Sequence, residues 1–229
     1  YGVINADRPN TYVIVKVGDH WGAVGSTTGI FTDLAAVNGI RNDPDYAPGL
    51  LGRHVEKNFG DSSLYTLYYN PTEGIVLDGL ETLMDKFGFT TSVTQQFSEV
   101  LAGVQANGKP VTWVVHSQGG VIYTEAVRYN GGNLSMNSVI FQAGANNQWV
   151  TNDILQNANI NQKPNQKTAY HDSPFDLVPN VIGLNGNPVT IVTSILAAPF
   201  LFMGPEWSPH TLPYRPRPSI DWPNLEPGP

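Results

Sequence analysis

The sequence predicts an α/β fold, with a mostly parallel central sheet, helices on both faces and an antiparallel hairpin at one edge. Short apolar runs at residues 111–115 and 138–142 are typical of strands buried on both faces. Helical patterns lie between the strand candidates, and this alternation predicts parallel strands joined by crossover helices. With 229 residues, 41% hydrophobic and 14% charged, the chain has enough apolar material for one domain with a substantial core.

The first third of the chain predicts a hairpin, two further strands and one helix. Residues 11–25 alternate apolar and polar side chains around a Gly-Asp turn, which indicates a hairpin at a sheet edge. Residues 30–37 are the next strand candidate and lead into an Asn-Gly turn. Helical spacing covers residues 44–58, for which Asp43 is the expected N-cap. Aromatic and β-branched side chains over residues 63–69 predict another strand.

The middle of the chain continues with helices and buried strands. Helical patterns at residues 75–87 and 93–106 precede the apolar run at 111–115. Another helical pattern ends near Tyr129, before the strand expected at 138–142.

The last third is less regular. Residues 144–166 are rich in Asn and Gln and give no clear pattern, and a weak strand follows at 167–170. Residues 188–203 are strongly apolar and fit either a core strand with a packing helix, or a lid or acyl-binding wall. We expect one domain over residues 1–214 and a proline-rich surface tail over 215–229.

Charge and cysteine content exclude several classes of protein. The net charge of −7 argues against nucleic acid as a partner, and any membrane-surface contact must depend on apolar side chains. The absence of cysteine excludes a disulfide framework, a Cys-ligated zinc site and a Cys nucleophile. The sequence begins at Tyr1 without a signal segment, so we expect part of a larger polypeptide or a product processed from one.

Ser117 is the candidate nucleophile. It stands in the sequence His-Ser-Gln-Gly-Gly, between a buried strand and a helix, which is the setting of a nucleophile elbow. This sharp turn needs small neighbours; Gly119 is one, whereas Val115 occupies a position where glycine is usual. The alternative interpretation is that Ser117 only caps the following helix.

A serine nucleophile needs a base and an acid that orients the base, and in α/β-hydrolases the chain order is Ser, acid, His. His210 leaves room for an acid before it and lies in a loop segment, whereas we expect His171 to be a surface or supporting residue. Asp176 is the expected acid, and Asp172, directly after the weak strand, is the alternative. A geometric test distinguishes the two carboxylates.

Acyl transfer also needs backbone donors for the developing oxyanion. The expected donors are the N–H groups of Gln118 and Ile40, with Gly39 as the second choice in the loop after an earlier strand. The alternative for this loop is an ordinary Asn-Gly turn. Residues 184–207 are a candidate lid or acyl-pocket insertion. Expected substrate contacts are Asn38, His116, Leu196 and Phe200.

Five short motifs occur in a fixed order: VNGI at 37–40, YNPTEG at 69–74, HSQGG at 116–120, DLVP at 176–179 and SPHT at 208–211. Together they resemble the lipase-like α/β-hydrolase domains at the C-termini of large bacterial secreted or toxin-like proteins. The resemblance implies an α/β-hydrolase fold and hydrolysis of esters, phospholipids among them. It also implies that no metal or organic cofactor is needed. The sequence does not fix the localisation, and secretion or delivery outside the producing cell is favoured.

The sequence therefore predicts a serine-dependent ester hydrolase, lipase-like or phospholipase-like, that works through an acyl-enzyme. The expected partners are an ester or lipid substrate and a transient membrane surface, with no nucleic acid. Two other hypotheses fit the same residues: a transacylase or peptidase with the same triad, and an inactive hydrolase-fold binding domain. Val115 and the Asn/Gln-rich segment favour the inactive domain.

Overall fold

The computed structural model describes most of the chain. The described residues are 4, 10–39, 42–71, 91–160, 168–202 and 207–211. Three features expected from the sequence lie outside them: the oxyanion donor Ile40, the helix at 75–87 and the tail at 215–229.

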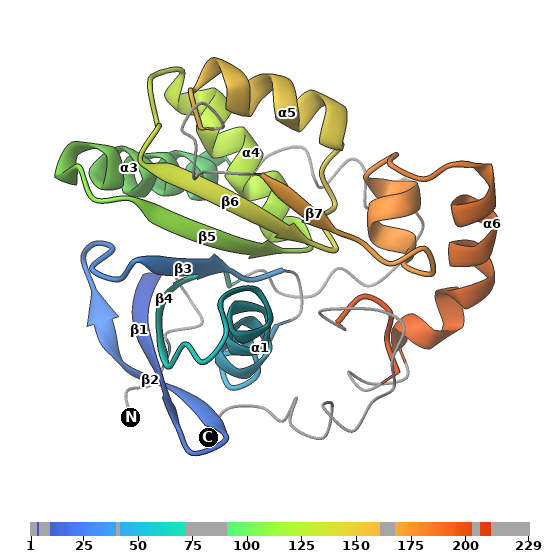
Figure 1. The fold of residues 1–229 in the computed structure, drawn as a ribbon, viewed down its shortest axis with the longest axis horizontal. Coiled ribbons are helices and arrows are strands. Elements are labelled where there is room, and N and C mark those ends of the chain that lie inside the picture. The colour runs from blue at the N-terminus through green and yellow to red at the C-terminus, as the bar shows by residue number, and fades with distance from the viewer. Residues whose placement is uncertain are drawn as a thin grey trace.

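A seven-stranded mixed sheet forms the centre of the described structure, with the strand order β2-β1-β4-β3-β5-β6-β7 (Figure 1). The strands are β1 (Asn10–Val17), β2 (His20–Thr27), β3 (Leu34–Val37), β4 (Leu64–Tyr69), β5 (Val111–His116), β6 (Asn137–Gln142) and β7 (Ala169–His171). Strands β4, β3, β5, β6 and β7 pair in parallel, while β1 is antiparallel to both of its neighbours. The prediction of a mostly parallel sheet with an N-terminal edge hairpin is confirmed.

Helices cover both faces of the sheet. They are α1 (Ala47–Phe59), α3 (Thr91–Asn107), α4 (Gln118–Asn130), α5 (Gln148–Asn157) and α6 (Pro188–Ala197), with a π-helix at Val178–Ile182 and a 3₁₀-helix at Ala198–Phe202. Helix α1 packs on one face, and α3 and α4 pack on the other (Figure 1). No helix in the described part of the chain is both long and apolar enough to cross a membrane.

Strand β5 explains why its sequence is apolar without alternation. Its side chains at Trp113 and Val115 enter the core that includes Phe97 of α3 and Tyr123 of α4. The side chain of Val114, between them, enters the separate core formed with α1. A strand buried on both faces is mostly apolar without alternation, which is the pattern of residues 113–115.

The start of α1 differs from the prediction. The helix begins at Ala47 rather than Pro44, and its N-cap is Tyr46. Asp43 is therefore not the N-cap; its carbonyl instead accepts from the N–H groups of Tyr46 and Ala47, both at 2.9 Å. The intervening residues form a turn, and Pro48 occupies the first turn of the helix, where its missing N–H costs nothing.

Two segments of the last third contain helices that the sequence pattern did not define. Helix α5 lies within the Asn/Gln-rich stretch, and the Asn147 side chain caps it by accepting from Val150 N–H at 3.0 Å. The described part of the apolar segment, residues 188–202, forms α6 and a 3₁₀-helix, so the expected core strand is wrong there. Asn187 starts α6 with a capping box that includes the Thr190 side chain.

Candidate active site

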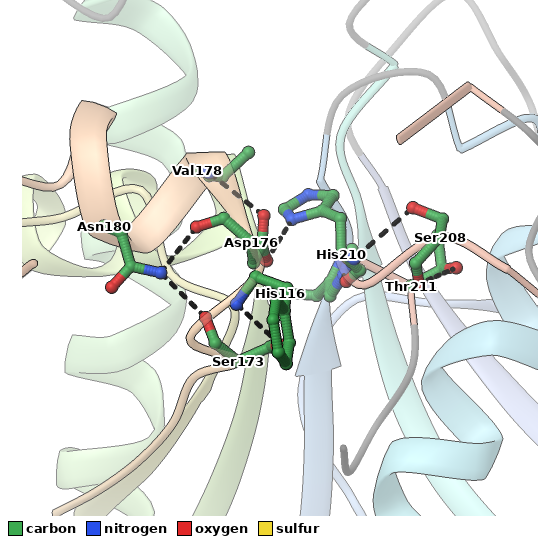
Figure 2. A network of polar contacts seen from close by, with 9 residues as sticks. His116, Ser173, Asp176, Val178, Asn180, Ser208, His210 and Thr211 are labelled. Atoms are coloured by element: carbon green, nitrogen blue, oxygen red, sulfur yellow. Dashed lines mark hydrogen bonds and ion pairs between the residues drawn. The ribbon is translucent and has the colours of Figure 1, made fainter. Parts of the chain in front are cut away.

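The candidate residues gather at the carboxyl ends of the parallel strands. Gly39 follows β3, Ser117 follows β5, and Asp172 follows β7. Parallel neighbours end at the same edge of a sheet, where α/β proteins usually bind ligands. The segment 207–211 brings His210 to this edge from near the end of the described chain (Figure 2).

Ser117 has a strained backbone conformation at the turn between β5 and α4. Its φ of 55° and ψ of −123° are rare for a residue with a side chain, and such a conformation costs about 1–3 kcal/mol. The neighbouring strand holds the turn, since Ser117 N–H donates to the Gln142 carbonyl at 3.1 Å. The side chain makes no capping hydrogen bond to α4. Ser117 thus occupies the N-cap position of α4 without capping the helix through its hydroxyl.

Two glycines allow the chain to pass close to Ser117. A Cβ at Gly119 would lie 2.7 Å from the Val37 carbonyl oxygen, and one at Gly39 would lie 2.6 Å from Ser117 Cβ. Both distances are too short for any larger residue. Val115, where the motif usually has glycine, is fully buried in the core with α3 and α4, so the fold accommodates its side chain.

His210 is paired with a buried carboxylate. Its Nδ1 lies 2.8 Å from Asp176 Oδ2, and the Asp176 side chain has no exposed surface (Figure 2). Val178 N–H donates to the other carboxylate oxygen at 3.0 Å. Because a carboxylate only accepts, Nδ1 carries a proton, and in the neutral form of the ring Nε2 is then the nitrogen that can accept one. Asp176 thus fixes both the tautomer and the orientation of His210.

Asn180 holds the loop that carries the acid. Its side-chain Nδ2 donates to the carbonyls of Ser173 and Asp176, both at 2.7 Å (Figure 2). The π-helix that contains Asn180 begins directly after this loop, at Val178. Asn180 therefore holds the loop 173–176 by hydrogen bonds to its first and last residues, and this loop carries the Asp176 carboxylate.

Asp172 has a different environment. Its Oδ2 accepts from Gln148 Nε2 at 2.6 Å, while its Oδ1 has no hydrogen-bond partner. Burial, and then the nearby charge of Asp176, raise the pKa of Asp172 to about 7. Of the two candidate acids, the structure brings only Asp176 into contact with His210.

The raised pKa of Asp172 has a consequence for stability. The folded protein binds this proton more tightly than the unfolded chain, whose Asp pKa is near 3.8, so the free energy of unfolding falls as pH rises from about 4 to about 7. We expect Asp172→Asn to raise the free energy of unfolding by up to about 4 kcal/mol near pH 8, and to leave it almost unchanged near pH 4. Urea unfolding of both proteins measures the difference. An equal difference at the two pH values would show that the Asp172 carboxyl is not shifted.

Ser117 and His210 lie at the same edge of the sheet, but their side chains are not hydrogen-bonded to each other. No hydrogen bond links the Ser117 hydroxyl to the His210 ring. In many hydrolases this contact tightens only when the substrate binds. Among the described residues, no cluster of His, Asp and Glu could hold a metal ion.

The loop after β3 is braced to β4 and to the start of α4. Asn38 Oδ1 accepts from Asn70 N–H at 2.6 Å, and Asn38 Nδ2 donates to the Asn70 carbonyl at 2.8 Å. Asn70 Nδ2 in turn donates to Gln118 Oε1 at 3.2 Å. The backbone of Gly39, next in the chain after Asn38, lies beside Ser117, since a Cβ at Gly39 would be 2.6 Å from Ser117 Cβ.

The residues expected to contact a substrate lie in two environments. Asn38 and His116 are buried, and His116 Nε2 lies 2.9 Å from the His210 carbonyl. Leu196 and Phe200 are exposed on α6 and the 3₁₀-helix. His171, expected to be a supporting residue, is half-buried on β7, and burial lowers its pKa.

Three supporting residues were not expected from the sequence: His54, Asn70 and Asn180. Asn70 lies within the motif YNPTEG, and Asn180 directly follows the motif DLVP. These two motifs are therefore the sequence signal that points to both residues. His54 lies in helix α1 without any motif, and its ring stacks on His116 at a centroid distance of 5.1 Å. Nothing in the sequence around His54 indicates that contact.

No protein-family model matches the chain, and no curated protein sequence matches it significantly. The geometry at Ser117, Asp176 and His210 is therefore the basis for assigning a function.

Proposed function

We propose that the chain is a serine hydrolase with an α/β-hydrolase fold that cleaves carboxylic esters through an acyl-enzyme. The strained turn at Ser117, between β5 and α4, is the observation that carries the proposal. A positive φ at a serine is costly and persists only where the surroundings impose it, and such sites are often functional. The buried Asp176–His210 pair at the same sheet edge supplies the base that the serine needs.

In the proposed first step, Ser117 Oγ attacks the ester carbonyl while His210 Nε2 takes its proton. Asp176 stabilises the imidazolium that forms, and the N–H groups of Gln118 and of the Gly39–Ile40 loop stabilise the oxyanion. The intermediate collapses to a Ser117 acyl ester, and the imidazolium gives its proton to the departing alcohol. His210 then takes a proton from water, which attacks the acyl ester and releases the carboxylic acid and free Ser117.

The proposal is tested by hydrolysis of p-nitrophenyl esters with acyl chains of increasing length. We expect saturable turnover, with release of both the alcohol and the acid. A fully folded protein that turns over none of the esters would contradict the proposal and favour a binding domain without activity.

Exposed apolar side chains on α6 support an apolar acyl group as the substrate. Four residues of this helix have more than half of their surface exposed: Val189, Val192, Ile195 and Leu196. The helix contacts the acid loop, since Thr193 Oγ1 donates to the Pro174 carbonyl at 2.8 Å. Exposed apolar patches on soluble proteins commonly mark binding sites. We therefore favour a lipase-like or phospholipase-like activity over hydrolysis of small polar esters.

The double substitution Leu196→Ser with Phe200→Ser tests this preference. Loss of two apolar contacts, each about 1 kcal/mol, should raise KM for long-chain esters roughly 10- to 30-fold and leave short-chain esters nearly unaffected. Steady-state kinetics on both ester classes measure the effect. Phe31→Ser is the matched control, because Phe31 is 76% exposed and precedes β3 at the opposite end of the sheet. Equal changes for both ester classes would contradict an acyl-binding role.

A further inference from the structure

Three imidazole rings lie in contact in a row at the candidate active site, with the pair His54–His116 stacked and the pair His116–His210 tilted. The rings of His210 and His116 have centroids 4.8 Å apart, and His116 and His54 have centroids 5.1 Å apart. His116 and His54 are buried, and only His210 belongs to the proposed catalytic residues. His116 is the last residue of β5 and directly precedes Ser117. The contact between the His116 and His210 rings therefore connects the proposed base to the strand that directly precedes the proposed nucleophile.

A hydrogen bond reinforces this connection. His116 Nε2 lies 2.9 Å from the backbone carbonyl oxygen of His210, a contact between residues 94 positions apart in the chain (Figure 2). A carbonyl oxygen can only accept, so His116 Nε2 carries the proton. His116 Nδ1 is buried and has no hydrogen-bond partner. The His116 ring therefore acts as a hydrogen-bond donor to the segment 207–211, which carries the proposed base His210.

His116 remains neutral in this position. Burial, followed by the neighbouring His210 and His54 rings, lowers the pKa of His116 well below its ordinary value. A neutral ring allows the adjacent His210 to become charged during the reaction, whereas a second cation would oppose that step.

Within the part of the chain that the structure describes, the main chain of His210 makes one further hydrogen bond. Its N–H donates to Ser208 Oγ at 3.3 Å, which is a contact within the same segment, 207–211. The bond from His116 links the main chain of His210 to strand β5, and Asp176 holds the His210 ring. Loss of the His116 donor would remove this link between His210 and the strand that directly precedes Ser117.

We propose that His116 is a positioning residue, whose Nε2–H bond to the His210 main chain sets the distance between the base and Ser117. This inference rests on the proposed hydrolase function. Misplacement of a catalytic group by about 1 Å can reduce the rate about 100-fold, so the effect is expected in kcat rather than in substrate binding.

Two variants of nearly equal shape separate the hydrogen bond from packing. Glutamine can place an amide donor near the position of His116 Nε2, whereas methionine has similar length but no donor. We expect His116→Met to lower kcat roughly 10- to 100-fold with little change in KM, and His116→Gln to recover most of that loss. Equal kcat values for the two variants, whether high or low, would overturn the proposal.

A second measurement does not depend on activity. The Nδ1 proton of His210, hydrogen-bonded to Asp176, is followed by its downfield proton NMR resonance in the full chain. We expect this resonance to remain in His116→Gln and to broaden or shift in His116→Met. If the protein hydrolyses no ester but the resonance behaves this way, the positioning inference stands and the proposed function fails. An unchanged resonance in both variants would overturn the inference.

Discussion

Replacement of Ser117 by alanine is expected to lower kcat for ester hydrolysis by about 10⁴- to 10⁶-fold, the range seen when a hydrolase nucleophile is removed. The physical reason is that no other group can form the acyl-enzyme, and what remains is the contribution of substrate binding and the oxyanion donors. Steady-state kinetics on a short-chain ester measure the fall in kcat. Short esters are used because binding of the acyl chain contributes least to their turnover.

The fold should survive this substitution. The Ser117 side chain makes no capping hydrogen bond to α4, and alanine is no larger. We expect the free energy of unfolding to change by less than about 1 kcal/mol. Circular dichroism and urea unfolding provide the control. A folded Ser117→Ala protein that keeps its activity on short-chain esters would refute Ser117 as the nucleophile.

Asp176→Asn should have the second largest effect, a fall in kcat of about 10³- to 10⁴-fold. An asparagine amide at this position can donate to His210 Nδ1, which would move the ring proton to Nε2 and leave the base unable to accept from Ser117. KM should change little, because the buried acid does not reach the substrate.

Asp172→Asn is the matched control for this prediction. Both residues are partly or fully buried aspartates in the same loop region, four positions apart, and only Asp176 contacts His210. We expect Asp172→Asn to retain kcat within about threefold, since Asn keeps an oxygen for the bond from Gln148. The reverse ranking of the two variants would mean that Asp172 is the working acid.

Much of the sheet could be predicted because strands buried on both faces leave a local signature. The runs that became β4, β5 and β6 are rich in apolar and aromatic residues and do not alternate regularly with polar ones. Ser117 could be proposed for the same reason: the strand, the turn and the helix around it are adjacent in sequence. The helical start at Ala47 was missed because Asp43 and Pro44 also satisfy the rules for a turn.

The rest of the site depends on contacts between distant residues, which no local pattern encodes. The choice between Asp172 and Asp176 required the position of His210, which lies 34 residues after Asp176 in the chain. Likewise, the pairing of Asn38 with Asn70 spans 32 residues and follows from the neighbouring positions of β3 and β4. Residues 188–203 could not be assigned because their composition, without charges, suits a buried strand and an exposed apolar helix equally.

The most direct test of the central claim is covalent labelling of the wild-type protein with a fluorophosphonate, followed by mass spectrometry of its peptides. This reagent reacts with serines that a neighbouring base activates, so it reports on the nucleophile without any assumption about the substrate. We expect one modified residue, Ser117, and loss of the label in His210→Ala. A folded protein that takes up no label, or takes it up at another serine, would contradict the assignment of Ser117 as an activated nucleophile.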